Sequence, residues 1–162
     1  MLHDDKAVMG LPIYILVAIT VATIVIAVLS IALYNIWSDS QFHQVEHEID
    51  KITSDAENMF EYADEGTMIT IHVEFPSYVR FIVFGSLPKN DGSSEPENIT
   101  LDENTSNNYY FVMGDGRIKT AHSNARFSGK NTDEMAVFHA GTYDLKLELI
   151  KEVDGKTYVK IY

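Results

Sequence analysis

The sequence predicts an α+β protein, in which a long N-terminal transmembrane helix continues into a stalk and is followed by an antiparallel β-sandwich. Three observations lead to this fold class. Residues 7–38 are uncharged and mostly apolar, residues 39–65 contain no Gly or Pro, and apolar and polar side chains alternate in short segments of residues 67–162. With 162 residues, the chain can form one compact domain and an accessory segment.

The amino-acid composition excludes several classes of protein. Acidic residues outnumber basic ones 24 to 12, and the resulting net charge of −12 argues against nucleic acid as a partner, because basic side chains are needed to bind phosphate. The absence of Cys excludes a disulfide framework, a thiolate zinc site, an iron–sulfur cluster and a cysteine nucleophile. Apolar residues make up 46% of the chain, which is normal for a protein with a hydrophobic core.

The first predicted element is a membrane-spanning helix. Residues 11–34 form an apolar run of 24 residues, which is long enough to cross a hydrocarbon layer of about 30 Å as a helix. Tyr34 and Trp37 lie at its end, where aromatic side chains favour the membrane interface. A buried core helix is the alternative, but so long an uncharged run is rare in soluble folds.

Small side chains form a stripe along one face of this helix. The stripe consists of Thr20, Thr23, Ala27 and Ser30, spaced by three, four and three residues. Small residues in one row let helices pack closely in lipid, so we expect helix packing through this face. Lys6 is the only Lys or Arg in the first 50 residues, and this bias predicts a cytoplasmic N-terminus with the rest of the chain outside.

Residues 39–65 are predicted to continue the helix as a stalk. Apolar residues recur there at intervals of three and four, which is the spacing of a heptad seam. The seam consists of Phe42, Val45, Ile49, Ile52, Ala56 and Met59. The whole helix would cover residues 11–63 and be roughly 80 Å long at 1.5 Å per residue. The seam could pack on the helices of neighbouring subunits or on the chain's own C-terminal domain, and the sequence leaves both open.

The C-terminal part is predicted to be an antiparallel β-sandwich of about 95 residues, because short alternating segments are separated by turn residues. Residues 78–84 are apolar on both faces, which is typical of a central strand. Gly114-Asp115-Gly116 and Asp154-Gly155 predict hairpin turns. The predicted strands cover residues 69–75, 78–84, 109–113, 117–121, 143–149 and 157–161.

Residues 89–108 form a polar loop that is rich in Ser, Asn, Asp and Glu. It contains two acceptor sequences for N-glycosylation, Asn98-Ile99-Thr100 and Asn104-Thr105-Ser106. Calcium binding is an alternative use of the acidic residues, but they lack the ligand spacing of an EF-hand loop, and a solvated acidic loop is the default. These acids are Asp91, Glu95, Asp102 and Glu103.

One string in the stalk has the pattern of an inverted zinc-protease motif. His43, Glu46 and His47 fit H-x-x-E-H, and on a helix the two His would share a face. A working site also needs a third ligand and a pocket that excludes water. Because the sequence has no phosphate loop, dinucleotide fingerprint or nucleophile elbow either, we expect no enzyme, no cofactor and no specific metal site.

The residues before the span are Asp4-Asp5-Lys6-Ala7-Val8, and the apolar residues 15–21 follow. This N-terminus resembles that of archaeal type IV pilins and related surface proteins with class III signal peptides, over roughly residues 4–34. The resemblance implies that a membrane prepilin peptidase recognises Lys6 and Ala7 and makes Val8 the first mature residue. Met9-Gly10-Leu11-Pro12 departs from the Ser-Pro pair and apolar-Gly step of many members. Cleavage after Gly10, or an uncut plain anchor, are therefore the alternatives.

The resemblance implies a structural, non-enzymatic cell-surface protein, a type IV pilin-like subunit. Its parts would be a leader at 1–7, an apolar helix at 8–37, a helical stalk at 38–65 and an extracellular domain at 66–162. Its expected partners are membrane lipid, a prepilin peptidase and copies of itself or related pilins, in a single-pass membrane location or a surface filament. The alternative is a permanently membrane-anchored extracellular binding or accessory module, such as a minor pilin or a subunit that links to the S-layer.

Overall fold

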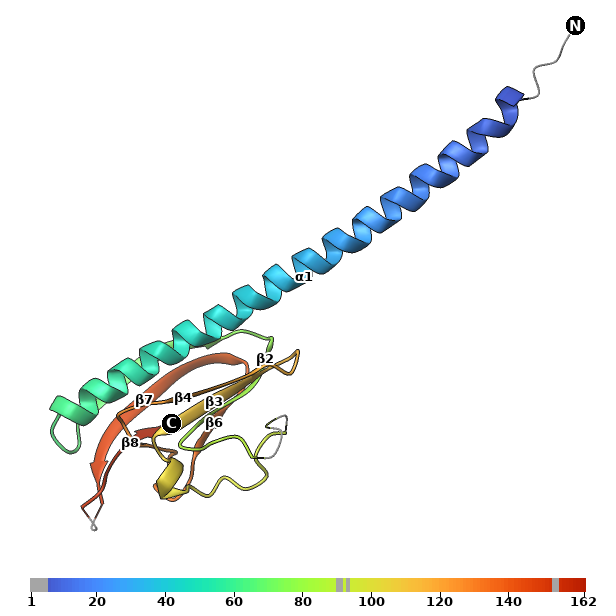
Figure 1. The fold of residues 1–162 in the computed structure, drawn as a ribbon. Coiled ribbons are helices and arrows are strands. Elements are labelled where there is room, and N and C mark those ends of the chain that lie inside the picture. Colours follow the sequence, from blue (N-terminus) through green and yellow to red (C-terminus); the bar gives the residue numbers. More distant parts are fainter. Residues whose placement is uncertain (1–5, 90–91, 93, 153–154) are drawn as a thin grey trace, which may run out of the picture. The chain divides into compact units, whose positions relative to one another are not determined.

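The computed structural model describes residues 6–89, 92, 94–152 and 155–162 of the chain, with side chains from residue 13 onward. The chain divides into two compact units, of which the first ends at Ser40 and the second covers Gln41–Tyr162. Helix α1 (Lys6–Tyr62) contributes to both units, and two β sheets follow it in the second (Figure 1). The predicted α+β class is confirmed at this level, with one long apolar N-terminal helix and two β sheets that are mainly antiparallel.

The end of α1 and the reversal of the chain depend on one glycine. Ala63 N–H still donates to the Met59 carbonyl oxygen at 3.0 Å, as in a helical turn. Gly66 then adopts a φ of 84°, which costs a glycine little because it has no Cβ. Its N–H donates to the Leu149 carbonyl oxygen at 2.8 Å, which joins the reversal to a strand late in the chain. The predicted stop at residues 64–66 is thus within a few residues of the observed end.

The first sheet has the strand order β1-β7-β8-β5. Strand β1 (Met68–Phe75) pairs with β7 (Gly141–Lys151) in the antiparallel sense, with Met68 opposite Glu148. Strands β7 and β8 (Thr157–Ile161) form an antiparallel hairpin. Along β1 and β7 the inward residues alternate with polar ones, as the sequence pattern predicts.

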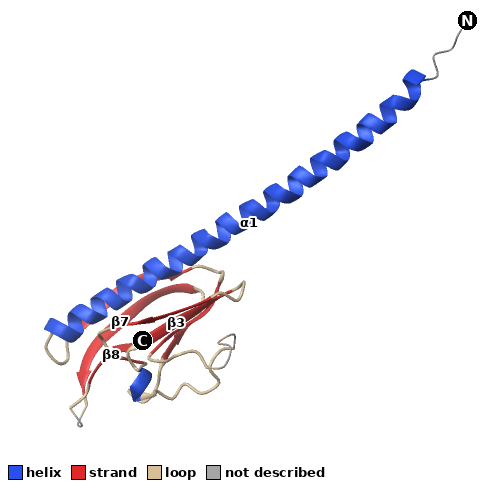
Figure 2. Cartoon of the chain, in the orientation of Figure 1, coloured by secondary structure: helices blue, strands red, loops and turns tan. Residues whose placement is uncertain are grey.

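The second sheet has the order β4-β3-β2-β6 and is antiparallel throughout. Figure 2 shows the strands of both sheets in red. Strand β2 (Val79–Phe84) lies between β3 (Asn108–Met113) and β6 (Ala136–Phe138), which confirms the prediction of a central strand at 78–84. Strand β4 (Ile118–His122) returns from β3 through a turn in which Gly116 has a φ of 87°. A short helix, η1 (Glu103–Thr105), precedes β3.

The prediction of a wholly antiparallel arrangement is wrong at one position. Strand β5 (Phe127–Ser128) pairs with β8 in the parallel sense, with Phe127 opposite Val159. Strands β5 and β6 were also absent from the prediction, because two or three residues are too few to establish an alternating pattern. A parallel pair needs a long crossover rather than a hairpin turn, so no local signal in the sequence marks it.

The main hydrophobic core of the second unit combines one face of α1 with residues from both sheets. The seam residues Val45, Ile49, Ile52, Ala56 and Met59 are at most 5% exposed. The sequence left open whether the seam packs on neighbouring helices or on the chain's own C-terminal domain. In the structure it packs on the chain's own strands. The strands contribute Val73, Phe75, Val79, Ile82, Phe84, Phe111, Met113, Phe127, Ala136, Leu145, Leu147, Leu149, Val159 and Ile161 to this core.

Aromatic stacking and a carboxylate also hold the helical segment 41–62 against the second sheet. The Phe42 ring centroid lies 5.2 Å from that of Phe111, and the Arg117 guanidinium lies 4.9 Å from the Phe42 centroid. One turn before the end of the helix, Glu57 Oε1 accepts hydrogen bonds from Ser123 Oγ at 2.7 Å and from Asn124 N–H at 3.0 Å. The helical segment is thus attached to the second sheet near its start and, near its end, to the residues that directly follow β4.

Candidate functional site

The helix of the first unit presents an apolar surface. Every large apolar side chain among residues 13–37 is exposed, from 45% for Trp37 to 77% for Tyr14. Among the residues described, α1 is the one helix that is long and apolar enough to cross a membrane. Aromatic rings gather at the end of the span, where the centroids of Tyr34 and Trp37 are 6.2 Å apart. This surface is suited to contact with lipid or with other apolar helices.

The predicted packing stripe lies on this helix with its polar groups satisfied. Thr20, Thr23 and Ser30 donate their hydroxyl hydrogens to the carbonyl oxygens four residues earlier, at 2.9, 2.8 and 2.8 Å. Together with Ala27 they form a row of small side chains that needs no partner for its hydroxyls. The row can therefore lie in lipid or against another helix without leaving a buried polar group unpaired.

The predicted cleavage residues Lys6, Ala7 and Val8 lie in the first turn of α1, and their side chains fall outside the described part of the structure, as do residues 1–5 altogether. The other predicted helix-packing residues, Val45, Ile49 and Ile52, lie in the second unit and pack on its strands.

The H-x-x-E-H string forms a charged cluster that includes a strand residue. His43 Nδ1 lies 2.8 Å from Glu46 Oε2, and Lys119 of β4 donates a hydrogen bond to the same carboxylate. Partial burial acts to raise the pKa of Glu46, but the hydrogen bonds from Lys119 and His43 outweigh it and lower the pKa below its ordinary 4.5. His47 is exposed. Within the described residues, no three His, Asp or Glu side chains are grouped so that they could hold a metal ion.

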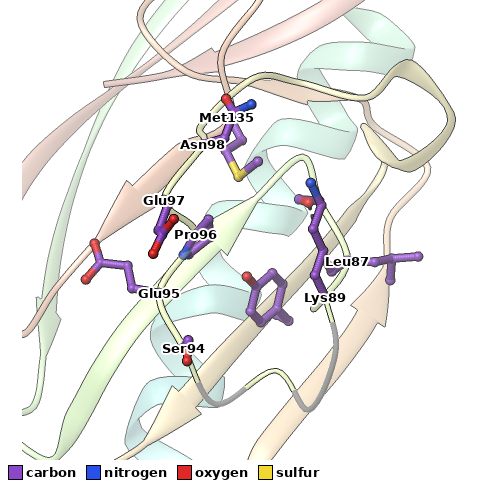
Figure 3. A pocket seen from close by; sticks show the side chains of 10 residues that line it. Leu87, Lys89, Ser94, Glu95, Pro96, Glu97, Asn98 and Met135 are labelled. Atoms are coloured by element: carbon purple, nitrogen blue, oxygen red, sulfur yellow. Dashed lines mark hydrogen bonds between the residues drawn. The ribbon is translucent and has the colours of Figure 1, made fainter.

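A cavity of about 420 Å³ opens on the second sheet, on the face away from the main core. That face carries a second apolar cluster of Phe81, Val83, Tyr110, Val112 and Met135. Residues of the polar loop and Leu87 just before it line the cavity, with Leu87 and Lys89 on one side and residues 94–98 on the other (Figure 3).

The cavity is apolar at its base and charged at its rim. Tyr110 and Met135 contribute apolar surface, and burial together with the nearby Glu95 carboxylate raises the pKa of Tyr110. Glu95 Oε1 lies 3.0 Å from His139 Nε2 at the rim. The sequence pattern does not predict this cavity. Its one signal was the apolar character of residues 78–84 on both faces, which requires that a second layer of residues cover the sheet.

The two glycosylation sequences lie in this loop with different local structures. Asn98 is exposed, and its Oδ1 accepts hydrogen bonds from Thr100 N–H at 2.9 Å and Thr100 Oγ1 at 2.6 Å. Asn104 lies in η1, and its Nδ2 donates to Asp102 Oδ1 at 3.2 Å. The hydroxyl residue of this second sequence, Ser106, is 1% exposed.

The acidic residues of the loop do not converge. Asp102 caps η1 through the Asn104 N–H, Glu103 pairs with Lys156 beyond β7, and Glu95 pairs with His139. Asp91, the fourth residue considered for calcium, lies outside the described residues. The three described carboxylates thus each have a separate partner.

No family model matches the chain, and comparisons with curated proteins and with solved structures give no match. The function of the chain therefore has to be inferred from its own residues and contacts.

Proposed function

We propose that the chain is a structural cell-surface subunit of the type IV pilin-like class, without enzymatic activity. Its N-terminal helix is the anchor and its strand-containing unit lies outside the membrane. The observation that carries this proposal is the exposure of every large apolar side chain among residues 13–37. In water, exposed apolar surface costs about 25 cal/mol per Å², so this segment needs lipid or other helices around it.

The small-residue stripe supports self-association through the same helix. In lipid there is little hydrophobic driving force between helices, so close packing of small residues contributes much of their attraction. Thr20, Thr23, Ala27 and Ser30 provide such a face, and their hydroxyls are already paired within the helix. In a filament this face would pack on the helices of neighbouring copies.

The N-terminal resemblance supports processing by a prepilin peptidase, with Lys6 and Ala7 recognised and Val8 as the first mature residue. The single basic residue before the span, Lys6, favours a cytoplasmic N-terminus. The resemblance is also the reason to expect an archaeal source, related pilins as partners and a surface filament as the final location.

We infer that the two sheets are the layers of a β-sandwich that forms the extracellular domain. Residues of both sheets join one core, and the seam of α1 adds to it. In this arrangement the predicted stalk, residues 38–65, is largely part of the domain. In a filament the apolar helix would therefore lead directly into the domain, with no free coiled-coil segment between them.

The first experiment is to determine the N-terminal residue of the protein purified from its native membrane, by intact mass. A start at Val8 is the expected result, and a start at Leu11 would support the same pathway with the cut after Gly10. An intact N-terminus at Met1 or Leu2 would overturn the processed pilin and leave a permanent anchor.

A second experiment tests packing through the stripe. Ala27→Ile should reduce chemical cross-linking between copies in the membrane, because the larger side chain keeps the helices apart. Ala18→Ile is the matched control, since Ala18 lies on the opposite face of the same helix and is equally surrounded by apolar residues. Equal cross-linking of the two variants would contradict assembly through the stripe.

The cavity on the second sheet favours a second candidate, a permanently anchored binding or accessory module. Its volume of about 420 Å³ lies in the range of small-ligand sites, and the buried Tyr110 and Met135 give it an apolar base. This candidate predicts an uncut N-terminus and a chain that stays in the membrane as a single copy, so the N-terminal mass separates the two.

A further inference from the structure

The two N-glycosylation sequences are six residues apart, yet the fold presents them differently. In each, the sugar would be bonded to the side-chain nitrogen of the Asn, and the hydroxyl two residues later is part of what a transferase recognises. The availability of that nitrogen and of that hydroxyl therefore distinguishes the two sequences in the folded chain.

At Asn98 both groups are available. Thr100 N–H can only donate, so the atom facing it at 2.9 Å must be the amide oxygen of Asn98. The nitrogen consequently lies on the other branch of an exposed side chain. Thr100 is exposed as well, and its hydroxyl hydrogen bond at 2.6 Å is to the same Asn98 oxygen.

Backbone hydrogen bonds tie this segment to residues 133–135. Ile99 O accepts from Met135 N–H at 2.7 Å, and Leu101 N–H donates to Asp133 O at 2.8 Å. Asn98 also lies at the rim of the cavity, so open space adjoins its side chain (Figure 3). A sugar on Asn98 would therefore extend into open space without displacing a core residue.

At Asn104 the hydroxyl is not available, and the nitrogen is already engaged. The Asn104 side chain is exposed, but one N–H of its amide donates to Asp102 Oδ1 at 3.2 Å, and its backbone N–H donates to the same oxygen at 3.0 Å. Ser106 is 1% exposed, and its hydroxyl donates to the Glu103 carbonyl oxygen at 2.8 Å. The Ser106 carbonyl oxygen in turn accepts from Phe127 N–H at 2.7 Å, so exposing this hydroxyl would break the contact with β5.

We propose that Asn98 is the N-glycosylation site of this protein and that Asn104 remains unmodified. In the reaction, Asn98 Nδ2 forms a bond to the anomeric carbon of a sugar carried on a lipid phosphate. The bond from that carbon to the phosphate oxygen breaks, the phosphate leaves with the electron pair, and the amide proton passes to a base of the transferase. The inference depends on the proposed function in one respect, since the domain must lie outside the membrane to meet such a donor.

The test is mass spectrometry of loop peptides from the protein purified from its native membrane. We expect one added glycan mass, on the peptide that contains Asn98. Asn98→Gln and Thr100→Val should abolish it, Thr100→Ser should retain it because the hydroxyl remains, and Asn104→Gln should leave it unchanged. Comparing the thermal unfolding midpoints of Thr100→Val and Thr100→Ser separates loss of the site from loss of the fold.

A second measurement distinguishes the failure of this inference from the failure of the proposed function. A membrane-impermeant amine reagent, added to intact cells, should label Lys146 on the exposed face of β7. Labelled but unglycosylated chains, or chains with the glycan on Asn104, would overturn the Asn98 site and leave the anchored surface subunit intact. Chains protected from the reagent would overturn both.

Discussion

The two parts of α1 differ in how many apolar residues they carry, 21 in residues 13–37 and eight in residues 41–62, and in how they bury them. In residues 13–37 apolar side chains point in every direction, and Ile24 is 59% exposed. In residues 41–62 most of them occupy one seam, and Ile52 is 0% exposed because strands cover it, whereas Tyr62 at the end of the helix is 77% exposed. The outward positions of this second part carry polar residues such as His47, Asp50 and Ser54.

The difference shows that one continuous helix can carry two residue patterns, each suited to a different environment. Where apolar residues surround the helix, only a medium that is apolar on all sides satisfies them, as lipid or a helical bundle is. Where they form a stripe, a folded domain of the same chain is sufficient. The transition falls near Asp39, the first charged residue after the span, and Ser40, the last residue of the first unit.

The largest effect is expected from charges placed in the first part. The double substitution Val21→Asp with Val25→Asp puts two carboxylates near the middle of the apolar segment. Each adds about 2.5–3.5 kcal/mol to the free energy of membrane insertion. We expect most of the chain to leave the carbonate-resistant membrane fraction. Ser54→Asp with Asn58→Asp has the same spacing on the exposed face of the second part, and should remain in the membrane. If the two double variants fractionate alike, the first part is not an anchor.

The next effect compares equal truncations in the two parts. Ile52→Ala removes a fully buried side chain and should lower the free energy of unfolding of the strand-containing unit by about 2–5 kcal/mol. Ile24→Ala, at an exposed position, should change it by less than about 0.5 kcal/mol. Denaturant unfolding of the full chain in detergent, followed by near-ultraviolet circular dichroism, measures both. Similar values for the two variants would show that the seam does not pack on the strands.

A smaller loss is expected where the helix joins the second sheet. Glu57→Ala removes the acceptor of hydrogen bonds from Ser123 Oγ and Asn124 N–H, and should cost about 1–3 kcal/mol in the same assay. Glu61→Ala lies one turn later at an exposed position and is the control. A Glu57 variant as stable as the Glu61 variant would indicate that this carboxylate does not attach the helix to the sheet.

The smallest expected effect is a dependence of stability on pH, which arises from Glu46 near the start of the seam. Because the pKa of Glu46 is lowered in the folded chain, its contribution to stability is present above its ordinary pKa of 4.5 and is lost as the pH falls through the lower folded value. The unfolding midpoints of the wild type and Glu46→Gln should differ at neutral pH and converge in acid. The Lys119 side chain is 47% exposed, so the difference should be small. A gap that stays constant with pH would contradict this origin.

The sequence predicted the strands that are marked by a local pattern of residues. All six predicted strands are present, and the bounds of β8 agree with the prediction. Alternation over five or more residues marks such strands, whereas β5 and β6 are too short to show it. The order of strands was not predictable, because partners such as Met68 and Glu148 are 80 residues apart and no turn joins them.

The features of the candidate site also divide into those that a local sequence pattern predicts and those that depend on the folded chain. Thr20, Thr23, Ala27 and Ser30 share a face because helical spacing alone puts them there. The difference between Asn98 and Asn104 could not be read from their sequences, because it depends on Asp102, on the burial of Ser106 and on the strand that covers it. Likewise the cavity depends on where the polar loop folds back over the second sheet.

The position of β8 has a consequence for the synthesis of the protein. Although β8 follows all the other strands in the chain, it lies inside the first sheet, between β7 and β5. Until the ribosome has made residues 157–161, β5 has no strand to pair with in its sheet, and β7 can pair only with β1. The apolar segment 13–37 emerges more than a hundred residues earlier and can enter the membrane while the domain is still unfolded. The first sheet can therefore close only after its last strand has been made.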